Sequence, residues 1–133
     1  MKKWLGLLGV CAIGAQFLSC SSGQQLLSIS ITPSSETFLA PDPTLNVQLV
    51  AYGTYAHPPA TKDITNQVTW KSNTPQIAVV SSTGLLSPAG TGCGGAIISA
   101  TLLTNNPTGN VGVATMTATV DDIAVPSCPQ PGK

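Results

Sequence analysis

The stretch Val68-Thr69-Trp70-Lys71-Ser72-Asn73-Thr74-Pro75-Gln76-Ile77-Ala78-Val79-Val80, followed by Thr83-Gly84-Leu85-Leu86-Ser87-Pro88, carries most of the information about how this chain folds. It begins as an alternating strand, with Val68 and Trp70 on one side and Thr69 and Lys71 on the other. A polar turn leads to a short apolar strand at residues 77–80. Residues 81–84 then predict a hairpin loop, because Gly84 can adopt a positive φ. We expect Trp70 to anchor the core, since a side chain of this size buries on the order of 200 Å².

Further alternating segments lie on both sides of this stretch. Residues 27–32 predict a strand ended by Pro33, and residues 45–52 predict a second one. In the second strand the inward residues are expected to be Leu45, Val47, Leu49 and Ala51. Residues 98–102 and 114–120 predict the last two strands, while residues 34–43, 53–62 and 105–110 read as connections. No segment has the period of a helix. About seven short strands separated by Gly, Pro and Asn predict an all-β, two-sheet antiparallel sandwich.

Two motifs flank the tryptophan strand and connect it to a known family. Asp63-Ile64-Thr65 precedes the strand, and Gly94-Gly95-Ala96-Ile97-Ile98-Ser99-Ala100-Thr101 is a Gly-rich turn into an Ile-x-Ala-Thr strand. With Trp70 and the Gly84 hairpin, these motifs resemble the bacterial immunoglobulin-like domain, group 2, over residues 26–122. The resemblance implies an immunoglobulin-like antiparallel β-sandwich. The family includes adhesins, envelope spacers and accessory modules, so the fold does not identify a ligand.

The N-terminus reads as a secretory signal at residues 1–19. Met1-Lys2-Lys3 is positively charged, and residues 4–18 are apolar except for Gln16. This apolar run is shorter than the roughly 20 residues that a transmembrane helix needs. We therefore expect an exported chain with a cleavable signal.

The end of the signal, Phe17-Leu18-Ser19-Cys20, resembles a bacterial lipobox, although the family favours Leu at the position of Phe17. The resemblance implies lipidation at Cys20, a linker at residues 20–25 and an anchor in the cell envelope, most naturally in the outer membrane on its periplasmic or surface face. The alternative is ordinary cleavage nearby with Cys20 as a free thiol. Cys11 is a poor lipobox candidate, because Val10 before it is not small.

The charge of the exported part excludes polyelectrolyte partners. Residues 20–133 contain three lysines and five acidic residues, a net charge of −2, and no arginine occurs in the chain. Binding nucleic acid needs a clustered basic face, which three scattered lysines cannot form. The expected partners are the membrane, through the lipid anchor, and an envelope protein or a surface glycan.

Two cysteines, Cys93 and Cys128, remain after the signal and the lipid site are set aside. In an oxidising compartment they predict one disulfide, which would tie the Pro-rich tail at residues 123–133 to the domain. The alternative is a metal site, but these cysteines and the lone His57 offer too few ligands at short spacing. We expect no metal site and no cofactor.

Catalytic chemistry has little support in the sequence. Gly90-Thr91-Gly92-Cys93-Gly94-Gly95 satisfies Gly-x-Gly-x-x-Gly, but β-branched residues follow it where a phosphate-binding helix should begin. His57 has no nucleophile and orienting group to work with. Asp121 and Asp122 read as a solvated turn, with a weak Ca²⁺ site that adds backbone carbonyls as the alternative. We therefore expect no enzyme.

One surface segment is a candidate for binding. Residues 52–59 place Tyr52, Tyr55 and His57 beside two prolines at one loop end, and loops on a rigid sandwich often carry function. The alternative is that Tyr52 packs on the sandwich and the prolines protect an exposed edge. The sequence thus predicts a non-enzymatic envelope lipoprotein whose single immunoglobulin-like domain is a structural or protein-interaction module. A surface adhesin or carbohydrate-binding module that uses this loop is the alternative.

Overall fold

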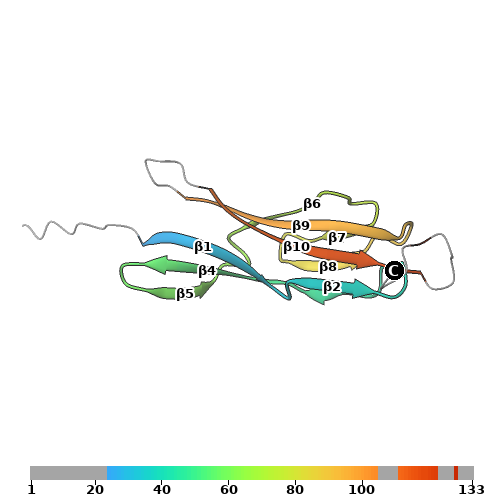
Figure 1. The fold of residues 1–133 in the computed structure, drawn as a ribbon, viewed down its shortest axis with the longest axis horizontal. Helices are drawn as coiled ribbons and strands as arrows, with labels where there is room; N and C mark the ends of the chain where they lie inside the picture. The colour runs from blue at the N-terminus through green and yellow to red at the C-terminus, as the bar shows by residue number, and fades with distance from the viewer. Residues whose placement is uncertain (1–23, 105–110, 123–127, 129–133) are drawn as a thin grey trace, which may run out of the picture.

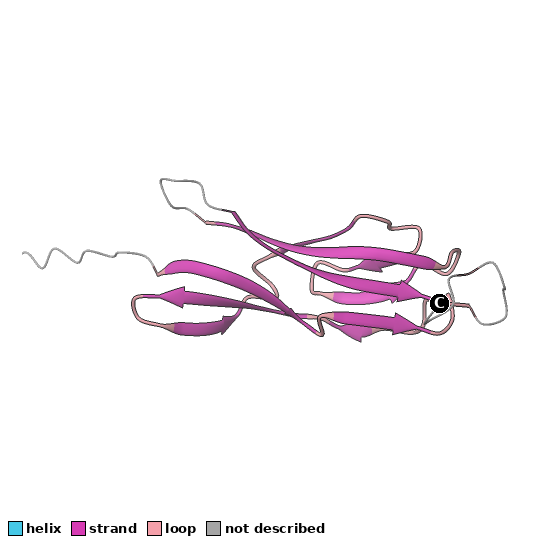
Figure 2. Cartoon of the chain, in the orientation of Figure 1, coloured by secondary structure: helices cyan, strands magenta, loops and turns pink. Residues whose placement is uncertain are grey.

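A computed structural model of the chain describes residues 24–104, 111–122 and 128. Signal, lipobox and Cys20 lie outside these residues, as does most of the tail. The described chain contains strands and no helix (Figure 2). The strands are β1 (Gln25–Thr32), β2 (Ser35–Phe38), β3 (Val47–Gln48), β4 (Val50–Ala56), β5 (Ala60–Asp63), β6 (Thr69–Ser72), β7 (Ala78–Val80), β8 (Leu85–Pro88), β9 (Gly94–Leu103) and β10 (Val111–Val120).

The strands form two layers (Figure 1). One layer is the four-stranded sheet β2-β10-β9-β6. The other layer combines the sheets β1-β4-β5 and β3-β8-β7. These two sheets are joined because β3 and β4 are consecutive parts of one extended segment, which is interrupted only at Leu49. The N–H of Leu49 donates to the Gly84 carbonyl at 2.8 Å, which joins this segment to the β7–β8 hairpin. This order corresponds to the two sheets of an immunoglobulin-type sandwich. The predicted all-β sandwich is confirmed.

The first strand of the domain changes layers at Pro33. β1 pairs with β4 antiparallel, whereas β2 pairs with β10 in parallel, from Ser35 beside Thr117 to Phe38 beside Val120. The sequence predicted only a connection at residues 34–43. Four residues are too few to show a clear alternation, but the burial of Phe38 fixes which side of β2 faces the core.

Trp70 lies in the core as predicted, with 9% of its surface exposed. Val68 beside it is buried, while Thr69 and Lys71 are exposed. The other buried apolar side chains come from both layers and include Leu49, Ala51, Ile64, Leu86, Ile98, Met116 and Val120. In the part of the chain that the structure describes, the core is therefore formed by packing between the sheets, and no disulfide crosses it.

The Asp63-Ile64-Thr65 motif holds Trp70 in place. The indole Nε1 donates to the Thr65 carbonyl at 3.0 Å. The Thr65 hydroxyl donates to Asp63 Oδ1 at 2.6 Å and accepts from the Ala51 N–H at 3.0 Å. The motif thus connects the strand of Ala51 to the tryptophan, which gives a physical reason for those residue types at that spacing.

These hydrogen bonds also act on Asp63. Donation by the Thr65 hydroxyl, and then by the Thr65 N–H, lowers the pKa of this carboxyl below its ordinary value. A lowered pKa in the folded state means that the ionised form stabilises the fold above the ordinary pKa. This contribution is lost as the pH falls through the lowered pKa.

The structure tests three further predictions, which concern the second predicted strand at residues 45–52, the connection at residues 53–62 and the hairpin at Gly84. Leu45 does not point inward: it is 39% exposed, because the strand begins only at Val47. Residues 53–62 are not a loop, because β4 continues to Ala56 and β5 returns from Ala60. At Gly84 the prediction is confirmed, with a φ of 83°, and a side chain there would meet the Leu49 carbonyl at 2.7 Å.

Candidate functional site

The residues predicted to form a binding loop lie on the β4–β5 hairpin. Tyr52 and Tyr55 belong to β4, and His57 is exposed in the turn between the strands, with a φ of 55°. Because side chains alternate along a strand, Tyr52 and Tyr55 point to opposite faces. Tyr52 and Tyr55 are therefore close in sequence, but the structure does not place their side chains on one surface.

Tyr55 faces inward. It is partly buried and packs against the hydrophobic core. The ammonium group of Lys62 lies 5.3 Å from the centre of its ring, close enough for a cation–π contact. Lys62 also donates to the side chain of Gln24, and Gln24 donates to the Pro58 carbonyl at 3.1 Å. These contacts close the end of the sandwich at which β1 begins.

Tyr52 faces outward and is 37% exposed. Its direct neighbours across the sheet are Ser30 of β1 and Asp63 of β5. An aromatic ring flanked by a hydroxyl and a carboxylate is an arrangement that can contact a sugar ring. Of the three predicted residues, Tyr52 offers the ring that such a ligand would use.

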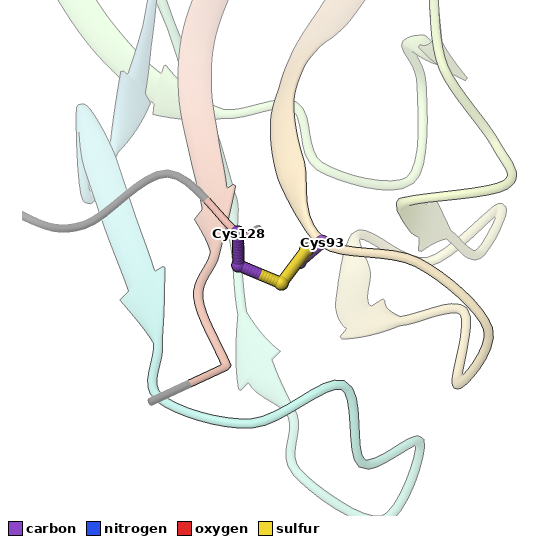
Figure 3. Close-up of a disulfide and its surroundings, with 2 residues drawn as sticks. All are labelled: Cys93 and Cys128. Atoms are coloured by element: carbon purple, nitrogen blue, oxygen red, sulfur yellow. A yellow bond between two sulfur atoms is a disulfide. The ribbon is translucent and has the colours of Figure 1, made fainter. Parts of the chain in front are cut away.

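The opposite end of the domain is closed by the predicted disulfide, which is confirmed. Cys93 before β9 and Cys128 after β10 are bonded, with their Cα atoms 5.6 Å apart and a sequence separation of 35 (Figure 3). Cys128 is buried. A cavity of about 190 Å³ lies beside the bond. Its lining residues are Pro41, Gly90, Thr91, Gly92, Cys93, Asp122 and Cys128.

The sequence predicted that Asp121, at this end of the domain, lies in a solvated turn. This prediction is wrong, because the residue is buried. Only 1% of its surface is exposed, and its N–H donates to the Phe38 carbonyl at 2.7 Å. Neither carboxylate oxygen accepts a hydrogen bond from any donor in the part of the chain that the structure describes. Buried polar groups normally have partners, so this carboxylate is the one polar anomaly of the described core.

A third region of interest is the outer half of β10. β9 pairs along the whole of β10, from Val111 to Val120, but β2 pairs only from Thr117 onward. The Thr117 N–H points toward β2, since it lies 3.4 Å from the Ser34 carbonyl. By alternation, the N–H groups of Val113 and Thr115 point to the same side. Among the described residues no strand pairs with this side of residues 111–116.

This open edge lies among exposed apolar side chains. The most exposed large ones nearby are Leu103, Val113 and Leu27, at 75%, 56% and 60%. A groove of about 230 Å³ runs between β1 and the β9–β10 hairpin. Its lining residues are Leu26, Leu27, Ser28, Thr104, Val111 and Gly112. At Gly112 an added Cβ would meet Leu26 Cδ2 at 2.7 Å, so the absence of a side chain lets β1 pack beneath the hairpin.

Charge does not protect the open edge. β1, β9 and β10 contain no charged residue and no proline. Exposed edges are usually blunted by lysine, proline or a bulge, and β10 has regular pairing with β9 throughout. The unpaired edge of β10 lacks these features, and β1 packs closely against the same strand.

The described residues contain few groups for chemistry. In residues 24–104, 111–122 and 128 there is no cluster of three or more His, Cys, Asp or Glu side chains that could hold a metal ion. In the same ranges no helix is long and apolar enough to cross a membrane. No family model matches the chain, and no curated protein matches its sequence. Function must therefore be argued from this chain's own surfaces.

Sequence reasoning missed both the open edge and the burial of Asp121. The open edge exists because β2 pairs with only part of β10. The length of this pairing cannot be predicted from the residue pattern of β2 or of β10 alone. The lack of charge across residues 94–120, where Asp and Glu are absent, was the signal that could have pointed to it. For Asp121 the sequence contains no comparable signal.

Proposed function

We propose that this chain is a non-enzymatic lipoprotein of the bacterial cell envelope, tethered through Cys20, whose single immunoglobulin-like domain is a protein-interaction module. The observation that carries the interaction role is the open, uncharged edge of β10 beside exposed apolar side chains. Strand addition at such an edge gains affinity from backbone hydrogen bonds and specificity from side-chain pockets. The groove lined by Leu26 and Val111 is a pocket of this kind.

The partner is, in this proposal, an extended segment of another envelope protein. It would lie against residues 111–116, in line with β2, and place an uncharged side chain in the groove. A charged segment would lose hydration there without gaining an opposite charge, because β1, β9 and β10 contain none.

We expect Thr115→Pro to weaken this binding strongly and Thr115→Ala to preserve it. The N–H of Thr115 points to the open edge, so proline removes a donor used only by the partner, and an edge strand tolerates it. Losing one backbone hydrogen bond of about 1 kcal/mol, together with the steric block, should weaken binding by about tenfold or more. The measurement is photocrosslinking in intact cells from a reactive residue placed at Val113.

The crosslinking has two controls. A reactive residue at Lys71, which is exposed on β6, should not give the same adduct. The thermal midpoint of Thr115→Pro should remain near that of Thr115→Ala. Equal adducts in the two Thr115 variants, or from both crosslinker positions, would exclude strand addition at this edge.

The tether makes its own prediction. The mature chain from the membrane fraction should carry lipid on Cys20, and Cys20→Ala should release the domain into the soluble exported fraction. Each buried CH₂ of an acyl chain contributes about 0.8 kcal/mol to membrane binding, so a multiply acylated chain should not dissociate. Intact-mass measurement decides the point: an unmodified Cys20 in the membrane fraction would remove the lipoprotein part of the proposal.

A second candidate function is supported by Tyr52. Its exposed ring between Ser30 and Asp63 suits an adhesin-like or carbohydrate-binding module better than Tyr55, which packs against the core. Retention of the purified domain on a polysaccharide column, without a protein crosslink at the β10 edge, would favour this candidate.

A further inference from the structure

Exposed apolar side chains gather at the end of the domain at which β1 begins. Leu103 and Val111 are direct partners in the pairing of β9 with β10, and 75% and 50% of their surfaces are exposed. Val113 lies on the same face of β10, because side chains two residues apart share a face, and it is 56% exposed. Leu27 of β1, which is 60% exposed, lines one groove together with Val111. We call these four side chains the apolar end.

Charge is distributed unevenly along the long axis of the domain (Figure 1). Glu36, Asp42 and Asp122 belong to the half that contains β2 and the disulfide. At the other end, β1, β9 and β10 contain no charged residue, and the β4–β5 hairpin contains the exposed Lys62, with Asp63 at its inner end. An anionic surface would therefore repel the disulfide end more than the end at which β1 begins.

The proposed tether joins the domain at the same end. Cys20 and Gln24 are four positions apart, and an extended chain spans at most about 3.6 Å per residue, so these two residues lie no more than about 14 Å apart. The headgroup layer of a bilayer is itself about 5–8 Å thick. A lipid on Cys20 would therefore hold the start of β1 close to the membrane surface. The β9–β10 hairpin, beside the start of β1, would be held there too (Figure 1).

We propose that the apolar end rests on the phospholipid surface to which Cys20 is anchored, so that the disulfide end points away from the membrane. This inference rests on the proposed lipidation of Cys20. Clustered exposed apolar side chains mark protein or membrane contact sites, and a lipid surface is the partner that the tether brings to these four. Their contact with lipid would be weak for a free domain. A short tether makes the contact intramolecular, with an effective concentration in the millimolar range, so a weak contact is enough to orient the domain.

The contact with lipid and the proposed strand addition use different groups. Lipid would contact the outward side chains of Leu103 and Val111, whereas a partner strand would use the N–H groups of Val113 and Thr115 at the edge of the sheet. If the domain stands on its apolar end, the open edge of β10 lies close to the membrane. The partner segment would then be one that runs beside the membrane surface.

The test uses the mature lipidated chain in vesicles of phosphatidylcholine with a minority of phosphatidylglycerol, with bromine on the acyl chains. Bromine quenches tryptophan fluorescence at short range. In Leu103→Trp the added tryptophan should be quenched, and its emission should shift to shorter wavelength. Trp70 is buried and gives the same background in every variant. Adding Val111→Asp should restore the fluorescence, because a carboxylate resists transfer out of water.

A matched control places the tryptophan at the other end. Leu39 directly follows β2 and is 60% exposed, in the same range as the leucines of the apolar end. Leu39→Trp should show only the background of Trp70. Because both leucines are exposed, the thermal midpoints of both variants should stay close to that of the unaltered chain.

Three results would overturn the proposal. If Cys20 carries lipid and neither added tryptophan is quenched, the domain is tethered without resting on the membrane. If both are quenched equally, the domain has no preferred end. If intact mass shows no lipid on Cys20, the tether fails and the membrane contact that depends on it fails as well. The first two results leave the lipoprotein part of the proposed function standing, and the third does not, so the two failures can be told apart.

Discussion

Replacing Trp70 with alanine is expected to lower the free energy of unfolding by about 3–5 kcal/mol. Trp70 is buried between the two layers, with 9% of its surface exposed, and removal of the indole leaves a cavity that the surrounding β-sheets cannot close. It also removes the donor to the Thr65 carbonyl, at the point where the Asp63-Ile64-Thr65 motif joins the strand of Ala51. Equilibrium unfolding in urea, followed by far-ultraviolet circular dichroism, measures the loss.

Two variants separate the parts of this effect. Trp70→Phe keeps most of the apolar surface and removes only the indole donor, so it should cost less, about 1–3 kcal/mol. Thr69→Ala changes an exposed neighbour on the same strand and should stay within about 0.5 kcal/mol of the unaltered chain. A cost below about 1 kcal/mol for Trp70→Ala would mean that the core is anchored elsewhere.

Removing the disulfide is the second large effect. Cys93→Ala combined with Cys128→Ala should lower the free energy of unfolding by about 3–4 kcal/mol, because the bond closes a 35-residue segment and limits the unfolded chain. Burial of Cys128 beside the cavity adds a packing contribution in the folded state. Urea unfolding of the oxidised chain and of the double variant gives the difference.

Reductant provides the control for this prediction. Adding it to the unaltered chain should bring its stability close to that of the double variant, and adding it to the double variant should change nothing. If the double variant is as stable as the oxidised chain, the bond does not constrain the unfolded state in the way that the chain-entropy argument requires.

The tryptophan strand and the hairpin after it could be predicted from sequence because their signals are local. Alternation around Trp70 and a glycine at position 84 are both set within a few residues, and the structure confirms both. The cysteine pairing was predictable because only two candidates remained after residue 20. These features required no knowledge of which strands are neighbours.

The features that could not be predicted from the sequence depend on contacts between segments that are far apart in the chain. β5 was read as loop because Pro58 and Pro59 precede it and its four residues are polar or small, yet β4 holds it by regular pairing. Asp121 looked solvated because acidic pairs usually are, and its burial follows from the way the end of β10 packs beside β2 and the disulfide. The open edge of β10 likewise arises from where β1 gives way to β2.

The change of layer at Pro33 also determines how the domain would respond to force. β1 begins at one end of the long axis and β10 finishes at the other (Figure 1). A pull between Gln24 and Asp122 would act along β2 and β10, which are parallel neighbours over four residue pairs. Their hydrogen bonds would be loaded together in shear rather than opened one at a time. A domain tethered at its N-terminus and gripped at its far end would therefore resist extension, and the disulfide would keep the segment between Cys93 and Cys128 closed even after the strands separate.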